Sequence, residues 1–189
     1  MIGVRQAEND PYDTIAQGII DTDIIESYRN VTIPTLSESL DFVEENDLIL
    51  NVDFYEPEHE HPFYSTYFNT CLSVIASKNI DSQIWITTRN STWLHIVESE
   101  YLLMLAVPTF DSASIEDTQM VETHGYSLVN TYMGLDNVVF STFDGTGIAV
   151  NAWTVNAVFR YSQLWCLGID YVTTDIPHVL SSLESPLLA

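Results

Sequence analysis

Apolar positions along this chain follow two different spacings, and the two spacings take turns. Short apolar runs predict six β-strands, at residues 48–54, 83–88, 102–107, 126–129, 148–154 and 169–173. Between these runs, apolar residues recur every three or four positions, as on the buried face of an amphipathic helix. The helices predicted in this way cover residues 35–43, 64–78, 93–97, 114–124, 158–167 and 177–183. Strands that alternate with helices indicate an α/β fold with a parallel sheet covered by helices.

Local signals at the helix ends agree with this interpretation. Thr35 and Glu38 have the spacing of a capping box at a helix start. Gly168 stands where a helix commonly ends, and Pro177 suits a first helical turn. Upstream of these helices, a weaker pattern predicts a short helix within residues 11–28. No glycine-rich loop follows the first strand, which argues against a nucleotide-binding doubly wound sheet.

The composition fits one folded domain. The chain has 189 residues, of which 46% are hydrophobic, and this is enough for a substantial core. We therefore predict a single domain over residues 1–189. No apolar run is long enough to cross a membrane, and the N-terminus lacks the basic start and apolar stretch of a signal peptide. These features predict no membrane insertion and a cytoplasmic location.

Charge is the unusual feature of the composition. The chain carries 27 acidic and 5 basic residues, a formal net charge of −22 at pH 7. A surface of this charge repels nucleic acid, so no nucleic-acid partner is expected. Two explanations remain. One is binding of cations or of a basic partner, and the other is adaptation to a salt-rich cytoplasm in which ions screen the self-repulsion. The acidic residues are spread along the whole chain, which favours the second, halophilic explanation.

A few residues are candidate metal ligands by type alone. In the run EPEHEH of residues 56–61, His59 and His61 could hold zinc together with a nearby glutamate. Alternating residues in a loop share no fixed face, so a solvated charge run is the alternative, and we favour it. Cys71 and Cys166 have neither a zinc spacing nor a disulfide framework. Their apolar helical surroundings predict two buried, reduced thiols.

Several segments of the chain resemble the glycerophosphodiester phosphodiesterase family. Residues 33–40 (IPTLSESL) are similar to the family's helix start IPTLEEVL, and residues 51–55 (NVDFY) stand where the family has a strand ending in IEIK. Residues 150–156 (VNAWTVN) and 168–177 (GIDYVTTDIP) are similar to the family's VWTVN and GVDGIITDYP, in the same order and at the same spacing. Residues 18–26 resemble the stretch that precedes the first of these segments. The resemblance covers about residues 18–183.

The resemblance implies a (βα)8 TIM-barrel-like fold with its site at the carboxyl ends of the strands. The six predicted strands would be the third through eighth of that barrel, so the barrel is incomplete. In the family, the first two strand–helix units carry a His-Arg-Gly motif, a metal-binding glutamate and a second histidine, and the two histidines move the protons. No counterpart of those units is found in this sequence. We therefore assign no catalytic residue.

The resemblance also assigns roles to individual residues. Asp53 stands at the glutamate of IEIK and is the candidate metal ligand; a solvated carboxylate is the alternative, because a divalent cation needs several oxygen ligands. Tyr55 stands at the family's lysine, so a cation that would neutralise phosphate charge is lost. Trp153 keeps an aromatic residue that lies against the substrate in the family, with plain packing as the alternative. Asn156 follows it as a candidate cap of the next helix.

Arg89 follows the second predicted strand, after Thr87 and Thr88. The end of a barrel strand is a suitable place for a phosphate contact, and this chain has few cations to offer. Pairing with a neighbouring acid is the alternative, which the excess of acidic residues favours.

Together these interpretations predict a glycerophosphodiester phosphodiesterase-family protein from a halophilic cell, truncated at its N-terminus. The family hydrolyses glycerophosphodiesters to glycerol phosphate and an alcohol with a divalent cation, Mg²⁺ or Ca²⁺, which this chain is expected not to bind tightly. Without the first two units, no turnover by the chain alone is expected. The alternative is a non-catalytic remnant or a binding and assembly module. Its open barrel edges would pair with another copy or with a complementary N-terminal fragment. A third interpretation is that the gene start is misplaced.

Overall fold

The computed structural model describes residues 32–56, 61–111, 115–134 and 140–181. The chain divides into two units, residues 1–35 and residues 36–189, and all the helices and strands below belong to the second. The helix predicted within residues 11–28 lies outside the described residues. The prediction of one domain over residues 1–189 stays a prediction.

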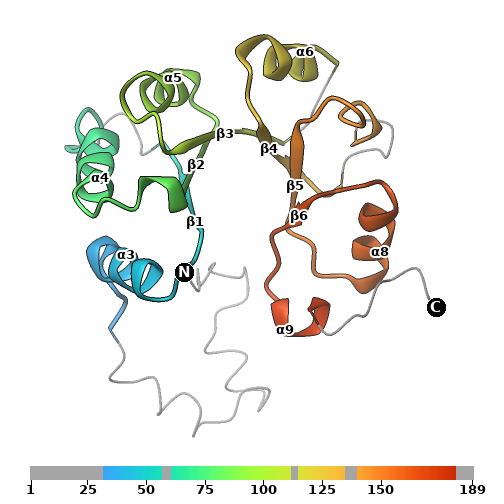
Figure 1. Cartoon of the computed structure of the whole chain (residues 1–189), viewed down its shortest axis with the longest axis horizontal. Helices are drawn as coiled ribbons and strands as arrows, with labels where there is room; N and C mark the ends of the chain where they lie inside the picture. Colours follow the sequence, from blue (N-terminus) through green and yellow to red (C-terminus); the bar gives the residue numbers. More distant parts are fainter. Residues whose placement is uncertain (1–31, 57–60, 112–114, 135–139, 182–189) are drawn as a thin grey trace, which may run out of the picture. The chain divides into compact units, whose positions relative to one another are not determined.

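Six strands form one parallel sheet, and their order in the sheet is their order in the chain (Figure 1). The strands are β1 (Leu50–Phe54), β2 (Ile84–Thr88), β3 (Leu105–Phe110), β4 (Leu128–Tyr132), β5 (Ala149–Trp153) and β6 (Tyr171–Val172). Neighbouring strands pair in register, with Asp53 opposite Thr87 and Asn130 opposite Asn151. All five pairings are parallel, which confirms the predicted parallel α/β sheet.

Helices connect the strands, as a parallel sheet requires. They are α3 (Leu36–Glu45), α4 (Tyr67–Ala76), α5 (Ser91–Glu100), α6 (Ile115–His124), α8 (Val158–Cys166) and α9 (Pro177–Leu180), with a 3-10 turn, η1, at Asp81–Gln83. Figure 1 shows them on the outer side of the strands. Helix α5 packs against β2 and β3, and α3 packs against α4. None of the helices in the described parts of the chain combines the length and the apolar character that a bilayer crossing requires.

The predicted third strand is displaced from the observed one. The apolar run LLMLAV predicts a strand from Leu102, but Leu102 and Leu103 are 81% and 70% exposed and lie in a turn. Pairing with β2 begins only at Leu105, and the strand continues through Pro108 to Phe110. A proline normally argues against an inner strand, because it donates no hydrogen bond. This is why the sequence pattern ended the strand too early.

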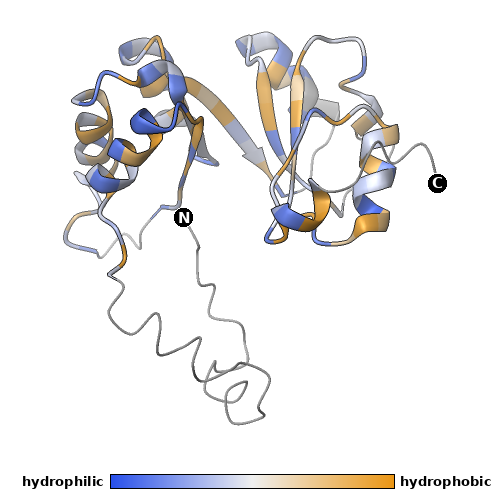
Figure 2. Cartoon of the chain, turned by 60° about the horizontal axis from the view of Figure 1, so that its bottom comes forward, coloured by the Kyte–Doolittle hydropathy of each residue, from blue (hydrophilic) through white to orange (hydrophobic). Residues whose placement is uncertain are grey.

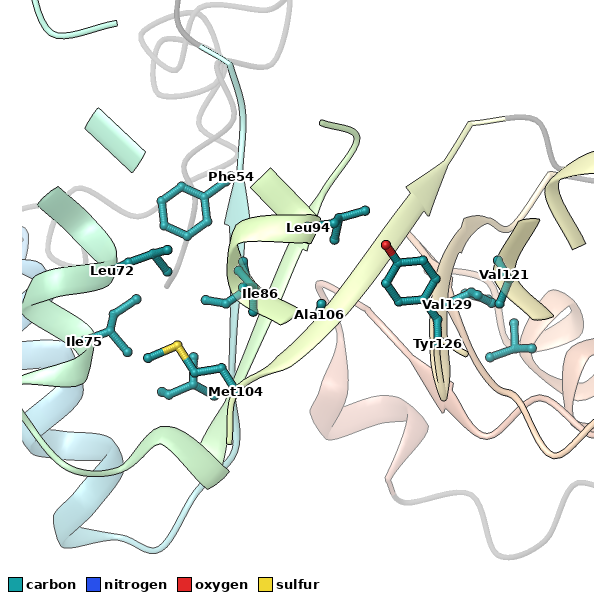
Figure 3. Close-up of a cluster of buried hydrophobic side chains, with 14 of the residues drawn as sticks. Phe54, Leu72, Ile75, Ile86, Leu94, Met104, Ala106, Val121, Tyr126 and Val129 are labelled. Carbon is teal, nitrogen blue, oxygen red and sulfur yellow. The ribbon is translucent and has the colours of Figure 1, made fainter. Parts of the chain in front are cut away.

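The core lies between the sheet and the helices. Every second strand residue faces the helices, as the period of a strand requires. Figure 3 shows Leu72 and Ile75 of α4 beside Phe54 and Ile86 of the sheet, in one buried cluster. Hydrophobic and hydrophilic bands alternate along both the strands and the helices (Figure 2). The helices therefore bury one face of the sheet, and its other face is not covered by them.

The sheet is curled, with that other face on the inside. Strands β2 and β6 are separated by three strands in the sheet order, so a flat sheet would hold them about 19 Å apart at the usual strand spacing. Yet the rings of Trp85 on β2 and Tyr171 on β6 meet edge to face, with their centroids 5.1 Å apart. The guanidinium of Arg89 after β2 likewise lies 5.8 Å from the ring centroid of Trp153 on β5. Such contacts require a curled sheet, as in a barrel wall.

Two chain reversals near the strand ends have clear local causes. Gly168 follows α8 with a φ of +77°, a conformation that costs a side-chain-bearing residue free energy, so the predicted helix end at this glycine is confirmed. At the other end of the sheet, the side chain of Asn90 accepts a hydrogen bond from the backbone N–H of Trp93 and caps α5. This cap fixes where α5 begins, two residues after Arg89.

Candidate functional site

A band of polar side chains crosses the inner face of the sheet. Its six members are Asn51, Thr87, Thr109, Asn130, Asn151 and Thr173, one on or beside each strand. We call this set the polar band. The hydroxyl of Thr87 donates to the amide oxygen of Asn51. The amide of Asn151 donates to the oxygens of Asn130 at 2.7 Å and of Thr173 at 3.0 Å. The amide of Asn130 donates in turn to the hydroxyl of Thr109 at 3.4 Å.

These hydrogen bonds are needed because most of the polar band is buried away from water. Asn130 and Asn151 are 6% and 4% exposed. A buried amide without partners costs free energy, so each must bond to a neighbouring strand. Barrel interiors are usually filled by branched apolar residues. Here polar residues take their place, and their hydrogen bonds form two groups, one on β1 and β2 and one from β3 to the residue after β6. The band supports the next layer of side chains, nearer the carboxyl ends of the strands.

Two residues after each member of the polar band stands an acidic, aromatic or basic residue. Three of these residues lie on strands, on the same face as the band because side chains in a strand alternate with a period of two, and the other three lie beyond the ends of their strands. These residues are Asp53, Arg89, Asp111, Tyr132, Trp153 and Asp175. We call them the site layer. Contacts across it connect different strands: Arg89 reaches Asp111 and Trp153, and the rings of Tyr132 and Trp153 lie 5.5 Å apart. Arg89, Asp111, Tyr132 and Trp153 therefore form one cluster of cationic, acidic and aromatic side chains at the strand ends.

Arg89 makes the most contacts within the site layer. Its Nη2 donates to Oδ1 of Asp111 at 2.5 Å, so the predicted pairing with an acid is found. Its guanidinium lies 5.5 Å from the ring centroid of Tyr55 and 5.8 Å from that of Trp153, within cation–π range of both. The hydrogen bond to Asp111, helped by one to Tyr55, raises the pKa of Arg89, so this group keeps its positive charge.

Trp153 lies between the sheet interior and the strand ends. Its side chain is half-buried, and its indole Nε1 is buried without a hydrogen-bond partner among the described residues. A buried indole N–H normally finds an acceptor. The ring also contacts both Tyr132 and Arg89.

Asp53 is an exposed member of the site layer, at the end of β1. Its negative charge, after burial and the charge of Cys71, contributes to the raised pKa of Tyr67. Within the described parts of the chain, no group of three or more His, Cys, Asp or Glu side chains is placed to hold a metal ion. Asp53 therefore stands without a described set of co-ligands.

Asn156 does not cap the next helix, contrary to the sequence-based expectation. The cap position of α8 is Ala157, which has no side-chain hydrogen bond there. Instead, Nδ2 of Asn156 donates to Asp175 at 2.7 Å, and its Oδ1 accepts from the hydroxyl of Thr174 at 3.2 Å and from the backbone N–H of Asp175 at 2.9 Å. Asn156 thus joins the loops that follow β5 and β6, because its short amide offers both donor and acceptor atoms.

The other candidate ligands are only partly described. His59 lies outside the described residues, and Nδ1 of His61 accepts from the backbone N–H of Phe63 at 3.3 Å. Glu56 accepts a hydrogen bond from the side chain of Asn90, so part of the acidic run is tied to the start of α5. Cys166 is exposed and Cys71 is half-buried, so the prediction of two buried thiols was wrong for Cys166.

The polar band and the role of Asp111 were missed by the sequence-based reasoning. Each band residue is a small polar residue in or beside a mostly apolar strand, and this is common in isolation. The signal is their common position: a polar residue followed two positions later by an acidic, aromatic or basic one, repeated at every strand. Reading the strands together, and not one by one, would have found both layers.

Comparisons with known proteins agree with this geometry. The chain is 30% identical over 183 residues to the chicken (Gallus gallus) glycerophosphodiester phosphodiesterase domain-containing protein 5, covering 95% of this chain and 29% of the relative. It is 25% identical over 171 residues to a mouse (Mus musculus) glycerophosphoinositol inositolphosphodiesterase, covering 84% and 28%. An Oleispira antarctica phosphodiesterase, solved with the product sn-glycerol-3-phosphate, superposes with a TM-score of 0.71 at 17% identity, over 83% of this chain and 63% of that chain. No family model matches the chain.

The curled parallel sheet with its covering helices is an incomplete (βα)8 TIM barrel, and the site layer lies at the end where such barrels place their ligand sites. The chain belongs to the glycerophosphodiester phosphodiesterase family, as the resemblance indicated. It spans less than a third of the length of the curated relatives that it matches.

Proposed function

We propose that the site layer of this chain binds a glycerophosphodiester, with Trp153 lying against the substrate. One observation carries the proposal: Trp153, which the resemblance places at the family's aromatic position, contacts Tyr132 and Arg89 at the strand ends, where barrels bind ligands. An aromatic face covers the carbon skeleton of a small polar ligand, while charged and polar neighbours fix its orientation. The relatives' names and the product-bound Oleispira structure support the same substrate class.

In this proposal, Asp53 offers one carboxylate ligand to Mg²⁺ or Ca²⁺. Its exposed position at the end of β1 suits such a role. Hard cations of this kind take six or more oxygen ligands, so one carboxylate holds them weakly, and we propose no tightly bound metal. When bound, a divalent cation would polarise the phosphoryl oxygens of a phosphodiester.

We expect the purified chain to bind a glycerophosphodiester without hydrolysing it. The sequence contains no His-Arg-Gly motif, and no residue of the site layer is a histidine that could move a proton at neutral pH. Titration calorimetry with glycerophosphocholine in molar potassium chloride should show saturable binding that Trp153→Ala weakens about tenfold. Release of sn-glycerol 3-phosphate, with Mg²⁺ or Ca²⁺, should stay at the level of the protein-free blank.

Trp165→Ala is the matched control, because Trp165 lies exposed on α8, outside the site layer. This variant should bind as the unmodified chain does. Equal loss of binding in the Trp153→Ala and Trp165→Ala variants would show that Trp153 has no specific role in binding. Steady release of sn-glycerol 3-phosphate above the blank would overturn the expected lack of turnover, and a known active phosphodiesterase assayed in the same salt shows that the assay can detect it.

A second candidate function is assembly through the edges of the sheet. Among the described residues, β1 pairs only with β2 and β6 only with β5, so each outer strand keeps one edge without a partner strand. Unpaired parallel edges invite pairing with another chain. The candidate partners are a second copy of the chain and a complementary N-terminal fragment.

Light scattering tests this second function. If the edges pair, the mass in molar salt should rise from monomer to dimer or higher between micromolar and hundred-micromolar concentrations. A constant monomer mass, together with no binding of a dye that reports exposed apolar surface, would rule out self-pairing. Adding a synthetic fragment that covers the first two strand–helix units of a relative distinguishes the two partners, because only the fragment model predicts a 1:1 complex.

We also propose a cytoplasmic location in a salt-rich cell. The spread of 27 acidic residues over the whole chain supports it, since a protein under strong salt gains solubility from such a surface.

A further inference from the structure

Arg89 is held at the centre of the site layer by partners from three other strands. Tyr55 follows β1, Asp111 follows β3 and Trp153 ends β5, and all three contact the guanidinium of Arg89 after β2. Arginine is planar and stacks on aromatic faces, so the rings of Tyr55 and Trp153 restrict the orientation of its guanidinium. Its side chain is still 42% exposed, and the carboxylate of Asp111 is 61% exposed. The guanidinium is therefore positioned but remains accessible to a ligand.

The position of Tyr55 bears on the role of Arg89. The resemblance places Tyr55 at the position of the family's lysine, so the end of β1 carries a ring where a cation is expected. The guanidinium of Arg89, from the neighbouring strand, lies over that ring, 5.5 Å from its centroid. A positive charge is thus present next to the position where one is expected, supplied by a different strand.

The other described cations are engaged elsewhere. Lys78, in the turn after α4, pairs with Asp41 of α3. Nε of Arg160 donates to the backbone oxygen of Met133 at 2.7 Å, and its guanidinium lies over the ring of Phe140. Arg89 is the basic member of the site layer. Helix α5, which has ten residues and no acidic residue in its first turn, begins two residues after it. The positive end of this helix dipole adds to the potential at Arg89.

We infer that Arg89 is the residue that binds the phosphoryl group in this site, and that Asp111 is an internal counter-ion which the phosphoryl group displaces. This inference rests on the proposed function for the identity of the ligand, but the anion site itself does not depend on it. A guanidinium binds phosphate oxygens through paired N–H donors, with the same geometry that it uses for a carboxylate. Asp111 therefore occupies, in the free protein, donors that a phosphate needs.

The two members of the pair give opposite predictions. Binding of inorganic phosphate and of sn-glycerol 3-phosphate is measured by titration calorimetry in molar potassium chloride. Arg89→Ala should weaken both at least tenfold, and Arg89→Lys should restore part of the loss. Asp111→Asn should strengthen both several-fold, because it removes a competitor and a repulsive charge. Lys78→Ala, which changes the net charge as Arg89→Ala does, should leave both unchanged.

The opposite signs separate binding from structure. If the Arg89–Asp111 pair only stabilised the fold, Asp111→Asn and Arg89→Ala would both weaken binding and both lower the midpoint of thermal unfolding. This outcome would overturn the inference. So would equal weakening by Lys78→Ala. If Arg89→Ala does not fold, the tighter binding expected of Asp111→Asn still tests the inference. Phosphate binding with these signs, but no gain in affinity from the glycerol moiety and no binding of glycerophosphocholine, would keep the anion site and overturn the proposed substrate.

Discussion

Transfer from molar potassium chloride into dilute buffer is expected to unfold this protein. The chain carries 27 acidic residues against 5 basic ones, and the described residues show two ion pairs of Lys or Arg with acids, Lys78–Asp41 and Arg89–Asp111. Most acidic charges thus repel one another without a basic partner nearby. The screening length is about 3 Å at 1 M salt and about 30 Å at 0.01 M, so dilution turns local repulsion into repulsion across the whole domain. Circular dichroism against salt concentration measures the transition.

A charge variant separates screening from the general stabilisation that salts give to apolar burial. Glu44, Glu45, Glu100 and Glu122 are exposed and lie on outer helices. Changing all four to lysine raises the formal net charge from −22 to about −14 and should lower the salt concentration at the unfolding midpoint by roughly half. An unchanged midpoint would show that screening is not the cause. Equal stability of the unmodified chain in dilute and molar salt would contradict the halophilic interpretation altogether.

Phe68→Ala is expected to cost about 3–5 kcal/mol of unfolding free energy, a large share of the roughly 5–15 kcal/mol that a domain has. Phe68 of α4 is 3% exposed. Its ring stacks on Trp93 of α5 at 4.5 Å and meets Phe54 of β1 edge to face at 4.9 Å. Removing the ring leaves a cavity where two helices meet the edge strand. Urea unfolding in molar potassium chloride measures the loss.

Phe159→Ala is the control for this prediction. Phe159 also lies in a helix, α8, but is 75% exposed, so the same substitution should change the unfolding free energy by no more than about 0.5 kcal/mol. Similar losses in both variants would mean that the Phe54–Phe68–Trp93 cluster is not where stability is concentrated. Because β1 carries Asp53, the Phe68 variant should also weaken any metal binding that depends on this carboxylate.

The alternation of strands and helices could be predicted because each element leaves its period in the sequence. The helix end at Gly168 and the family resemblance around Trp153 could be predicted for the same reason, since they rest on local residue patterns. Boundaries were harder: Leu102 and Leu103 continue an apolar run, yet they lie exposed in a turn. Hydrophobicity alone does not show where pairing with β2 begins.

The site could be predicted only in part, because its contacts join residues far apart in the chain. The excess of acids predicted that Arg89 would find a carboxylate, but the choice of Asp111, 22 residues later, depends on how far β3 extends past Pro108. The hydrogen bonds of Asn151 to Asn130 and Thr173 likewise depend on strand register. Register is a property of pairs of strands, and a single strand's pattern does not contain it.

The contact between Trp85 and Tyr171 has a consequence for how the chain folds. A stack of strand–helix units could in principle assemble from either end, one unit upon the next, as repeat proteins do. Here the second strand of the sheet touches the last, so the inner layer is incomplete until β6 has arrived. Contacts between such distant parts of a chain slow folding and make it cooperative. Trp85 fluorescence should therefore change late, together with the final docking of β6, and not stepwise as each unit forms.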